Sequence, residues 1–286
     1  MTTTTLLLPL SSPDHASAMV NQIADAFADQ DVHLIGLHVR PYIFSGSAAV
    51  SRASYGMYFS QDIINDHLQR IENDAQAVED AFNGPKLAPN ILREFRSPKG
   101  EPLDEIIRQS LYADVLVLPL LDIDEEDDEH RIKLSMTNYL LHNSSTPVLL
   151  LPMTGSLKPV FSRPLMAWKE SSEAGSALRT LMLLAPDGAH VDVVTAQKRF
   201  TGAKMGNVSL VDLASYVARH GYKVEDHTLV APSDQVAQAI CSKAADVGST
   251  LIVAGAYSRQ RWIEQLFGGV TQSLFLQTRH PVLFAR

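Results

Sequence analysis

The chain carries one arrangement of segments twice, and this duplication restricts the folds open to it more than any other feature. Four pairs of segments correspond in order: 6–12 with 164–171, 32–39 with 191–196, 114–118 with 250–254, and 146–150 with 280–284. The additional residues of the first copy lie between its second and third matched segments. A duplication of this kind predicts two structural units of the same fold.

Within each copy, short apolar segments alternate with helical patterns. In the second copy the apolar segments cover 164–168, 191–196, 224–230, 251–255 and 282–286. Two helical patterns between them end at Gly221 and Gly248, because glycine is favoured just after a helix. Continuous apolar segments such as 115–118 indicate strands that are buried on both faces. The alternation therefore predicts an α/β fold of two doubly wound domains, each with a parallel sheet.

Charge is divided unevenly between the two predicted domains, which we place at 1–152 and 160–286 with a linker at 153–159. The net charge is −8, but residues 1–152 hold 10 Lys and Arg against 22 Asp and Glu, whereas 153–286 hold 14 against 10. A negative chain is a poor partner for nucleic acid, whose binding depends on contacts to phosphate. Of the two domains, the second is the better candidate for binding an anion.

The cysteine content and the N-terminal segment indicate a reducing compartment. The one cysteine, Cys241, excludes a disulfide framework and a cysteine-based metal site, and it falls on the apolar side of a helical pattern, as expected of a core thiol. No segment reaches the roughly 18 apolar residues that span a bilayer, and residues 1–5 contain no basic leader. We expect a cytoplasmic protein without a membrane partner.

A glycine motif follows the apolar segment that ends at Gly255. Ser258 comes next, and after nine further residues the chain reads Gly268-Gly269-Val270-Thr271 and enters a helical pattern. Glycines at a strand end and at the start of a helix leave backbone N–H groups free to face an anion. The motif predicts a pocket of the size of a phosphate at the carboxyl end of a strand.

With its duplication, this motif resembles the universal stress protein family in its tandem form. Gly255, Ser258, Gly268 and Gly269 lie at the positions of the family's glycine signature, and both copies end in a Pro-Val-apolar strand. The resemblance implies two five-stranded parallel sheets (adenine nucleotide alpha hydrolase-like, flavodoxin- or Rossmann-like). It also implies that residues 148–151 pair with 282–284 in an internal pseudo-dimer.

The resemblance further implies a site for ATP or a related adenine nucleotide in the second domain, although other members of the family bind no nucleotide. Lys169, and Leu10 in the first domain, stand where nucleotide-binding members carry an acidic residue. The residues expected to line the site are Ala167, Trp168, Lys169 and Thr195 at the nucleoside end, and Ala254, Gly255, Ser258, Gly268, Gly269, Val270 and Thr271 at the phosphates.

The first domain offers no such site. Residues 122–129 contain seven acidic residues and no glycine, so they predict a solvated acidic loop that repels phosphate. Residues 61–82 form an amphipathic helix that packs on its own sheet or on a partner protein. No nucleophile and base, and no metal-ligand spacing, are evident, so we expect a binding protein and not an enzyme. A slow ATPase is the least supported alternative, because no residue stands out as a base for water. The alternative is a nucleotide-free module that acts through self-association and partner surfaces.

Overall fold

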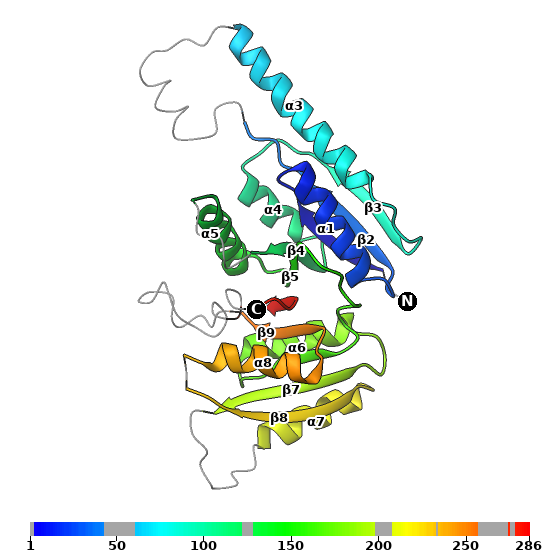
Figure 1. The fold of residues 1–286 in the computed structure, drawn as a ribbon, viewed down its shortest axis with the longest axis vertical. Coiled ribbons are helices and arrows are strands. Elements are labelled where there is room, and N and C mark those ends of the chain that lie inside the picture. Colours follow the sequence, from blue (N-terminus) through cyan, green and yellow to red (C-terminus); the bar gives the residue numbers. More distant parts are fainter. Residues whose placement is uncertain are drawn as a thin grey trace.

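The computed structural model describes residues 3–42, 61–121, 128–197, 208–232, 234–256, 274 and 278–286. In these residues the strands form one ten-stranded sheet in the order β3-β2-β1-β4-β5-β10-β9-β6-β7-β8 (Figure 1). The first five strands along the chain form one half of the sheet and the last five form the other, and β5 and β10 are the strands that join the two halves. Neighbouring strands are parallel everywhere except at that pair.

Strands and helices alternate in both halves. The first half consists of β1 Thr4–Pro9, α1 Pro13–Ala26, β2 Val32–Leu37, α3 Gln61–Asn83, β3 Ile91–Arg96, α4 Pro102–Ser110, β4 Val115–Leu120, α5 Asp128–Asn143 and β5 Val148–Pro152. The second half consists of β6 Pro164–Ala167, α6 Ser172–Leu184, β7 His190–Gln197, α7 Val208–Arg219, β8 Lys223–Val230, α8 Val236–Val247, β9 Leu251–Gly255 and β10 Val282–Ala285.

Local chemistry accounts for several helix ends. Ser12 and Ser171 precede α1 and α6 in extended conformation, and each hydroxyl accepts a hydrogen bond from the backbone N–H three residues on, at 3.3 and 3.2 Å. At the other end of α8, Gly248 adopts φ 68° and ψ 37°, a left-handed conformation that favours glycine. The predicted end of that helix is therefore confirmed.

Helices cover both faces of the sheet, as expected of a doubly wound fold. Residues of α1, α3, α6 and α7 share one apolar cluster with the strands, and residues of α4, α5 and α8 share the other. Each cluster contains residues from both halves, so the core is continuous across the molecule. The predicted fold class, two doubly wound α/β units with a five-stranded parallel sheet each, is confirmed.

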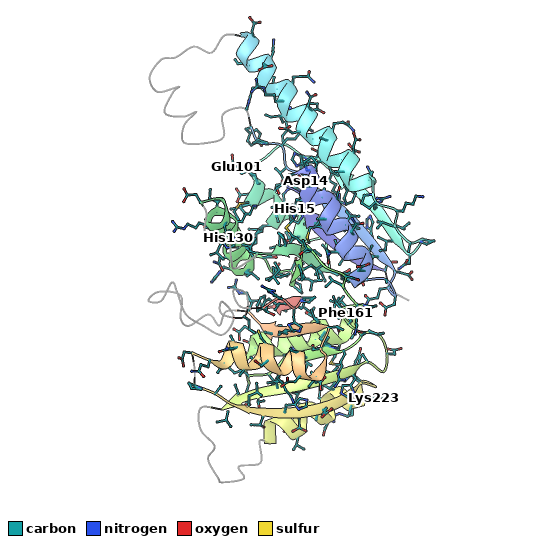
Figure 2. The ribbon with its side chains drawn as sticks, viewed as in Figure 1. Asp14, His15, Glu101, His130, Phe161 and Lys223 are labelled. Atoms are coloured by element: carbon teal, nitrogen blue, oxygen red, sulfur yellow. The ribbon has the colours of Figure 1, made fainter. Side chains whose placement is uncertain are left out.

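The two halves meet through their fifth strands. Leu149 pairs with Leu283 and Leu150 with Val282 in antiparallel register, so the predicted internal pseudo-dimer is confirmed. Phe27 and Phe161 add an edge-to-face contact between the halves, with ring centroids 5.9 Å apart; Figure 2 shows Phe161 at this junction. The domain limits at 152 and 160 remain a prediction.

The long helix α3 packs along only part of its length. Val78 and Phe82, near its C-terminal end, are buried against the cluster that includes α1, whereas Ile64 and Leu68 are half-buried. Its N-terminal end projects beyond the sheet in Figure 1. Packing on its own sheet is confirmed for the C-terminal part of the predicted helix.

Across the described ranges, every helix is too short or too polar to cross a bilayer.

Candidate functional site

The candidate site lies where the strand order reverses in the second half. β6 has β9 on one side and β7 on the other, and all three are parallel, so their carboxyl ends meet at one edge. Ala167 pairs with both Val194 and Ala254. The next row of the sheet contains Trp168, Thr195 and Gly255. Ligands of open α/β sheets bind at such reversal points.

The structure brings five of the predicted site residues together here: Ala167, Trp168, Thr195, Ala254 and Gly255. The backbone N–H of Trp168 donates to the carbonyl of Val194 at 2.7 Å, which extends the β6–β7 pairing by one residue. The Trp168 ring is half-buried against the cluster that contains α6 and α7. Lys169 follows it and is exposed. The edge therefore combines an aromatic ring with a solvated cation.

Thr195 supplies an unsatisfied polar atom at this edge. Its hydroxyl oxygen is buried and has no hydrogen-bond partner among the described residues. Buried polar groups are almost always paired with protein, water or ligand, because an unpaired one costs about 1–3 kcal/mol. Thr195 is thus the residue of this edge that most calls for an external partner.

Gly255 is required by packing as well as by any ligand. A Cβ built on Gly255 would lie 2.6 Å from the backbone nitrogen of Ala174 and 2.9 Å from Cβ of Glu173, both in the first turn of α6. The end of β9 and the N-terminal end of α6 therefore touch through their backbones. The sequence motif located this bare backbone correctly, but its contact with α6 was not predicted.

The N-terminal end of α6 forms one wall of the same edge. Ser171 caps the helix, and Glu173 lies in its first turn. The cap uses one of the N–H groups that an anion would otherwise bind, and the carboxylate adds a negative charge. Sequence reasoning identified the cap but not its position beside β9, which depends on the long-range contact to Gly255.

The phosphate end of the predicted site falls outside the described residues. This applies to Ser258, Gly268, Gly269, Val270 and Thr271. Most of the acidic loop of the first half, residues 122–127, lies outside them as well. Asp128, which starts α5, is fully solvated.

The corresponding edge of the first half is built from different groups. Leu7 pairs with Leu116 and Leu165 with Ile252, and this register makes Leu10 the counterpart of Trp168. The prediction that Leu10 corresponds to Lys169 was wrong by one residue, because the second half has one more residue between strand end and helix cap.

A histidine occupies the position of Thr195 in that first half. His38 follows β2, and its Nδ1 lies 3.0 Å from the carbonyl oxygen of Leu10. At this position, the side chain of the first half has a polar contact within the protein, whereas the hydroxyl of Thr195 has no hydrogen-bond partner among the described residues.

Cys241 has the core role expected of it. It lies on α8 against the buried cluster of that face, and burial raises the pKa of its thiol, with a smaller opposing effect from the hydrogen bond with Thr278. A protonated thiol is a poor nucleophile.

Comparison with solved structures identifies the fold. A universal stress protein from Archaeoglobus fulgidus DSM 4304 superposes with a TM-score of 0.66 at 18% identity, covering 99% of this chain and 96% of that protein. The fold is that of a tandem universal stress protein. A functionally unknown protein from Pseudomonas aeruginosa PAO1 aligns over 98% of this chain and 92% of its own, with a TM-score of 0.50 and 13% identity.

Sequence comparison adds no further relative. No protein-family model matches the chain, and no curated protein does. The universal stress protein fold is therefore established from the arrangement of strands and helices, which the match to the Archaeoglobus fulgidus protein follows through both halves.

Proposed function

We propose that the chain is a cytoplasmic stress-response protein that acts by binding, without turnover, and that its second half holds ATP or a related adenine nucleotide. The site is the edge formed by the carboxyl ends of β6, β7 and β9. The observation that carries the proposal is the hydroxyl of Thr195, which is buried and has no hydrogen-bond partner in the described part of the chain, at the point where the strand order reverses.

A nucleoside offers what this edge lacks. A ribose hydroxyl or a ring nitrogen of adenine can hydrogen-bond with Thr195 Oγ1, since a hydroxyl both donates and accepts. The exposed ammonium of Lys169 is one residue from Trp168 and attracts the negative charge of phosphate. The glycine motif at 268–269 provides backbone N–H groups for the phosphates in this proposal.

Isothermal titration of the purified full chain with ATP, ADP and AMP tests the proposal. Thr195→Val removes the hydroxyl and keeps the shape, so we expect about tenfold weaker binding from one lost hydrogen bond. Thr5→Val makes the same change on β1 in the other half and should leave affinity unchanged. Heat equal to dilution at millimolar nucleotide for the wild type would refute nucleotide binding.

Two further measurements examine the phosphate end and the natural ligand. Gly268→Asp adds charge and bulk to the glycine motif and should abolish nucleotide binding; unchanged affinity would move the phosphates elsewhere. Absorbance of the supernatant after denaturation of freshly purified protein reports any adenine nucleotide that it carries.

The alternative, a nucleotide-free module, is favoured by one surface. Ile132, Met136 and Tyr139 are 60%, 37% and 42% exposed, and their spacing places them along one face of α5. On this alternative the face binds a second copy of the chain. Light scattering on the wild type and on the double variant Ile132→Gln/Tyr139→Gln tests this alternative. A dimeric wild type and a monomeric variant are expected if α5 forms the contact, and a monomeric mass for both proteins would exclude self-association through α5.

A further inference from the structure

A second cluster of polar side chains lies on β7 and β8, nearer the amino ends of these strands than the candidate nucleotide site. Asp192 has a fully buried side chain, and it is surrounded by Arg163, His190, Glu225 and His227. These residues come from the start of β6 and from two neighbouring strands. Lys223, labelled in Figure 2, marks the end of β8 at which they gather.

The two oxygens of Asp192 face different partners. Oδ2 accepts from Arg163 Nε at 2.9 Å, and Oδ1 lies 2.9 Å from Nε2 of His227. Nε2 of His190 is 3.7 Å from the same Oδ1 and 3.6 Å from Oε2 of Glu225, too far for a hydrogen bond to either. This nitrogen is buried and has no hydrogen-bond partner among the described residues.

The first half provides the same positions with different residues. Leu7 pairs with Ile35 and Leu165 with Asp192, so Ile35 stands where the second half has Asp192. By the same register, His33 and Glu94 correspond to His190 and Glu225. His33 and Glu94 make a direct ion pair at 3.1 Å. In the second half the histidine nitrogen thus faces two carboxylates without a hydrogen bond to either, whereas in the first half it is paired directly with one.

We propose that His190 Nε2, Asp192 Oδ1 and Glu225 Oε2 bind a divalent transition-metal ion, for which Zn²⁺ is the probe. The three ligand atoms lie within 4.8 Å of one another. In a tetrahedral zinc site, metal–ligand distances of about 2.0–2.2 Å separate neighbouring ligand atoms by roughly 3.3–3.5 Å. The two separations from His190 Nε2, 3.6 and 3.7 Å, are close to that value, and the third, between the carboxylate oxygens of Asp192 and Glu225, is at most 4.8 Å. Three protein ligands leave the fourth position to water.

The surrounding charges permit a cation. Two carboxylates outweigh the single guanidinium of Arg163 within the group, and Lys223 is exposed at its rim. Arg163 occupies the oxygen of Asp192 that faces away from the two histidines, and His227 bonds the ligand oxygen. These contacts orient the carboxylate, which is the usual role of residues that surround a metal-ligand set.

Titration of the metal-free full chain with Zn²⁺, in competition with a chromogenic chelator, tests the site. We expect the first equivalent to bind in the micromolar range or tighter, and Glu225→Gln or His190→Gln to weaken it at least tenfold. His33→Gln is the matched control, because it removes the corresponding histidine of the first half and should leave the first equivalent unchanged. Mg²⁺, which prefers oxygen ligands, should not compete.

Glu225→Gln is the most informative variant, because a change at this exposed side chain should leave the protein folded. Glu225 is 56% exposed, whereas loss of Asp192 would leave Arg163 without its carboxylate. A second readout is the thermal midpoint, which Zn²⁺ should raise for the wild type and His33→Gln but not for Glu225→Gln. Equal zinc affinity in the wild type, Glu225→Gln and His190→Gln would overturn the proposal, as would an equal loss in His33→Gln. Nucleotide titrations are independent of either result.

Discussion

At the scale of single residues, the contact between Gly255 and α6 has the most immediate consequence. Gly255→Ala would press a methyl group against the backbone of Ala174 at 2.6 Å, and backbone has little freedom to move. We expect the free energy of unfolding to fall by about 1–3 kcal/mol, as for other overpacked sites. Urea denaturation measures this loss.

A matched glycine checks that the loss comes from this contact. At Gly100 an added Cβ would approach its nearest neighbour only to 3.8 Å, which is ordinary van der Waals contact. Gly100→Ala should therefore cost clearly less than Gly255→Ala. Equal costs would contradict the close approach of β9 to α6.

His15 makes stability depend on pH. Burial, with a smaller contribution from Lys133, lowers the pKa of His15 to about 4 from 6.5, and its Nε2 is buried with no hydrogen-bond partner among the residues that the structure describes. The folded state therefore takes up this proton less readily than the unfolded state. Its contribution is complete above about pH 6.5 and is lost as the pH falls toward 4, at up to about 1.4 kcal/mol per pH unit.

Replacing His15 should remove that dependence. Between about pH 7 and about pH 5, the free energy of unfolding should fall less in His15→Asn than in the wild type, as measured by urea melts at the two pH values. His67→Asn, a change at an exposed position on α3, is the control and should behave as the wild type. A wild-type slope retained in His15→Asn would show that other groups cause it.

At the scale of elements, α8 depends on the glycine that ends it. Because Gly248 has φ 68°, Gly248→Ala should destabilise the chain by about 1 kcal/mol, and Gly248→Asn should cost less, since asparagine tolerates this conformation better. Thermal or urea melts of the two variants provide the comparison. A larger loss for asparagine than for alanine would be inconsistent with a conformational cause.

The elements also show what could be predicted from sequence. Short-range signals located Gly248 and the caps Ser12 and Ser171. The β5–β10 pair was implied by the family resemblance, which rests on the duplicated segments and the glycine motif. Each of these depends on residues that are close in the chain or duplicated.

Contacts between distant residues were not predictable in the same way. His190 and Asp192 are two residues apart and share one face of β7, and Glu225 and His227 share one face of β8 in the same way. The sequence therefore shows that each pair lies on a common face. Their meeting depends on the register of two strands separated by α7. The contact between Gly255 and Ala174 likewise joins residues far apart in the chain.

At the scale of the whole molecule, the shared core predicts that the halves unfold together. Phe161 is 1% exposed and contacts Phe27 of the other half. Phe161→Ala should lower the free energy of unfolding by about 3–5 kcal/mol. Both tryptophans lie in the second half, so tryptophan fluorescence reports that half, while far-ultraviolet circular dichroism reports both.

Coincident transitions by the two probes are the expected result for the wild type. Separate midpoints would mean that the halves are stable independently of each other. Hydrogen exchange in β1 and β9 offers the same comparison by region, with similar protection expected in both strands.

The position of β10 has a consequence for how the chain is made. This strand follows the nine others in sequence, yet it lies in the middle of the sheet, between β5 and β9. During synthesis the edges of β5 and β9 therefore stay open until β10 has left the ribosome. An open strand edge is a template for pairing with another chain. Until β10 pairs with both, these two edges are therefore the places where the incomplete chain is most open to pairing with a strand of another molecule.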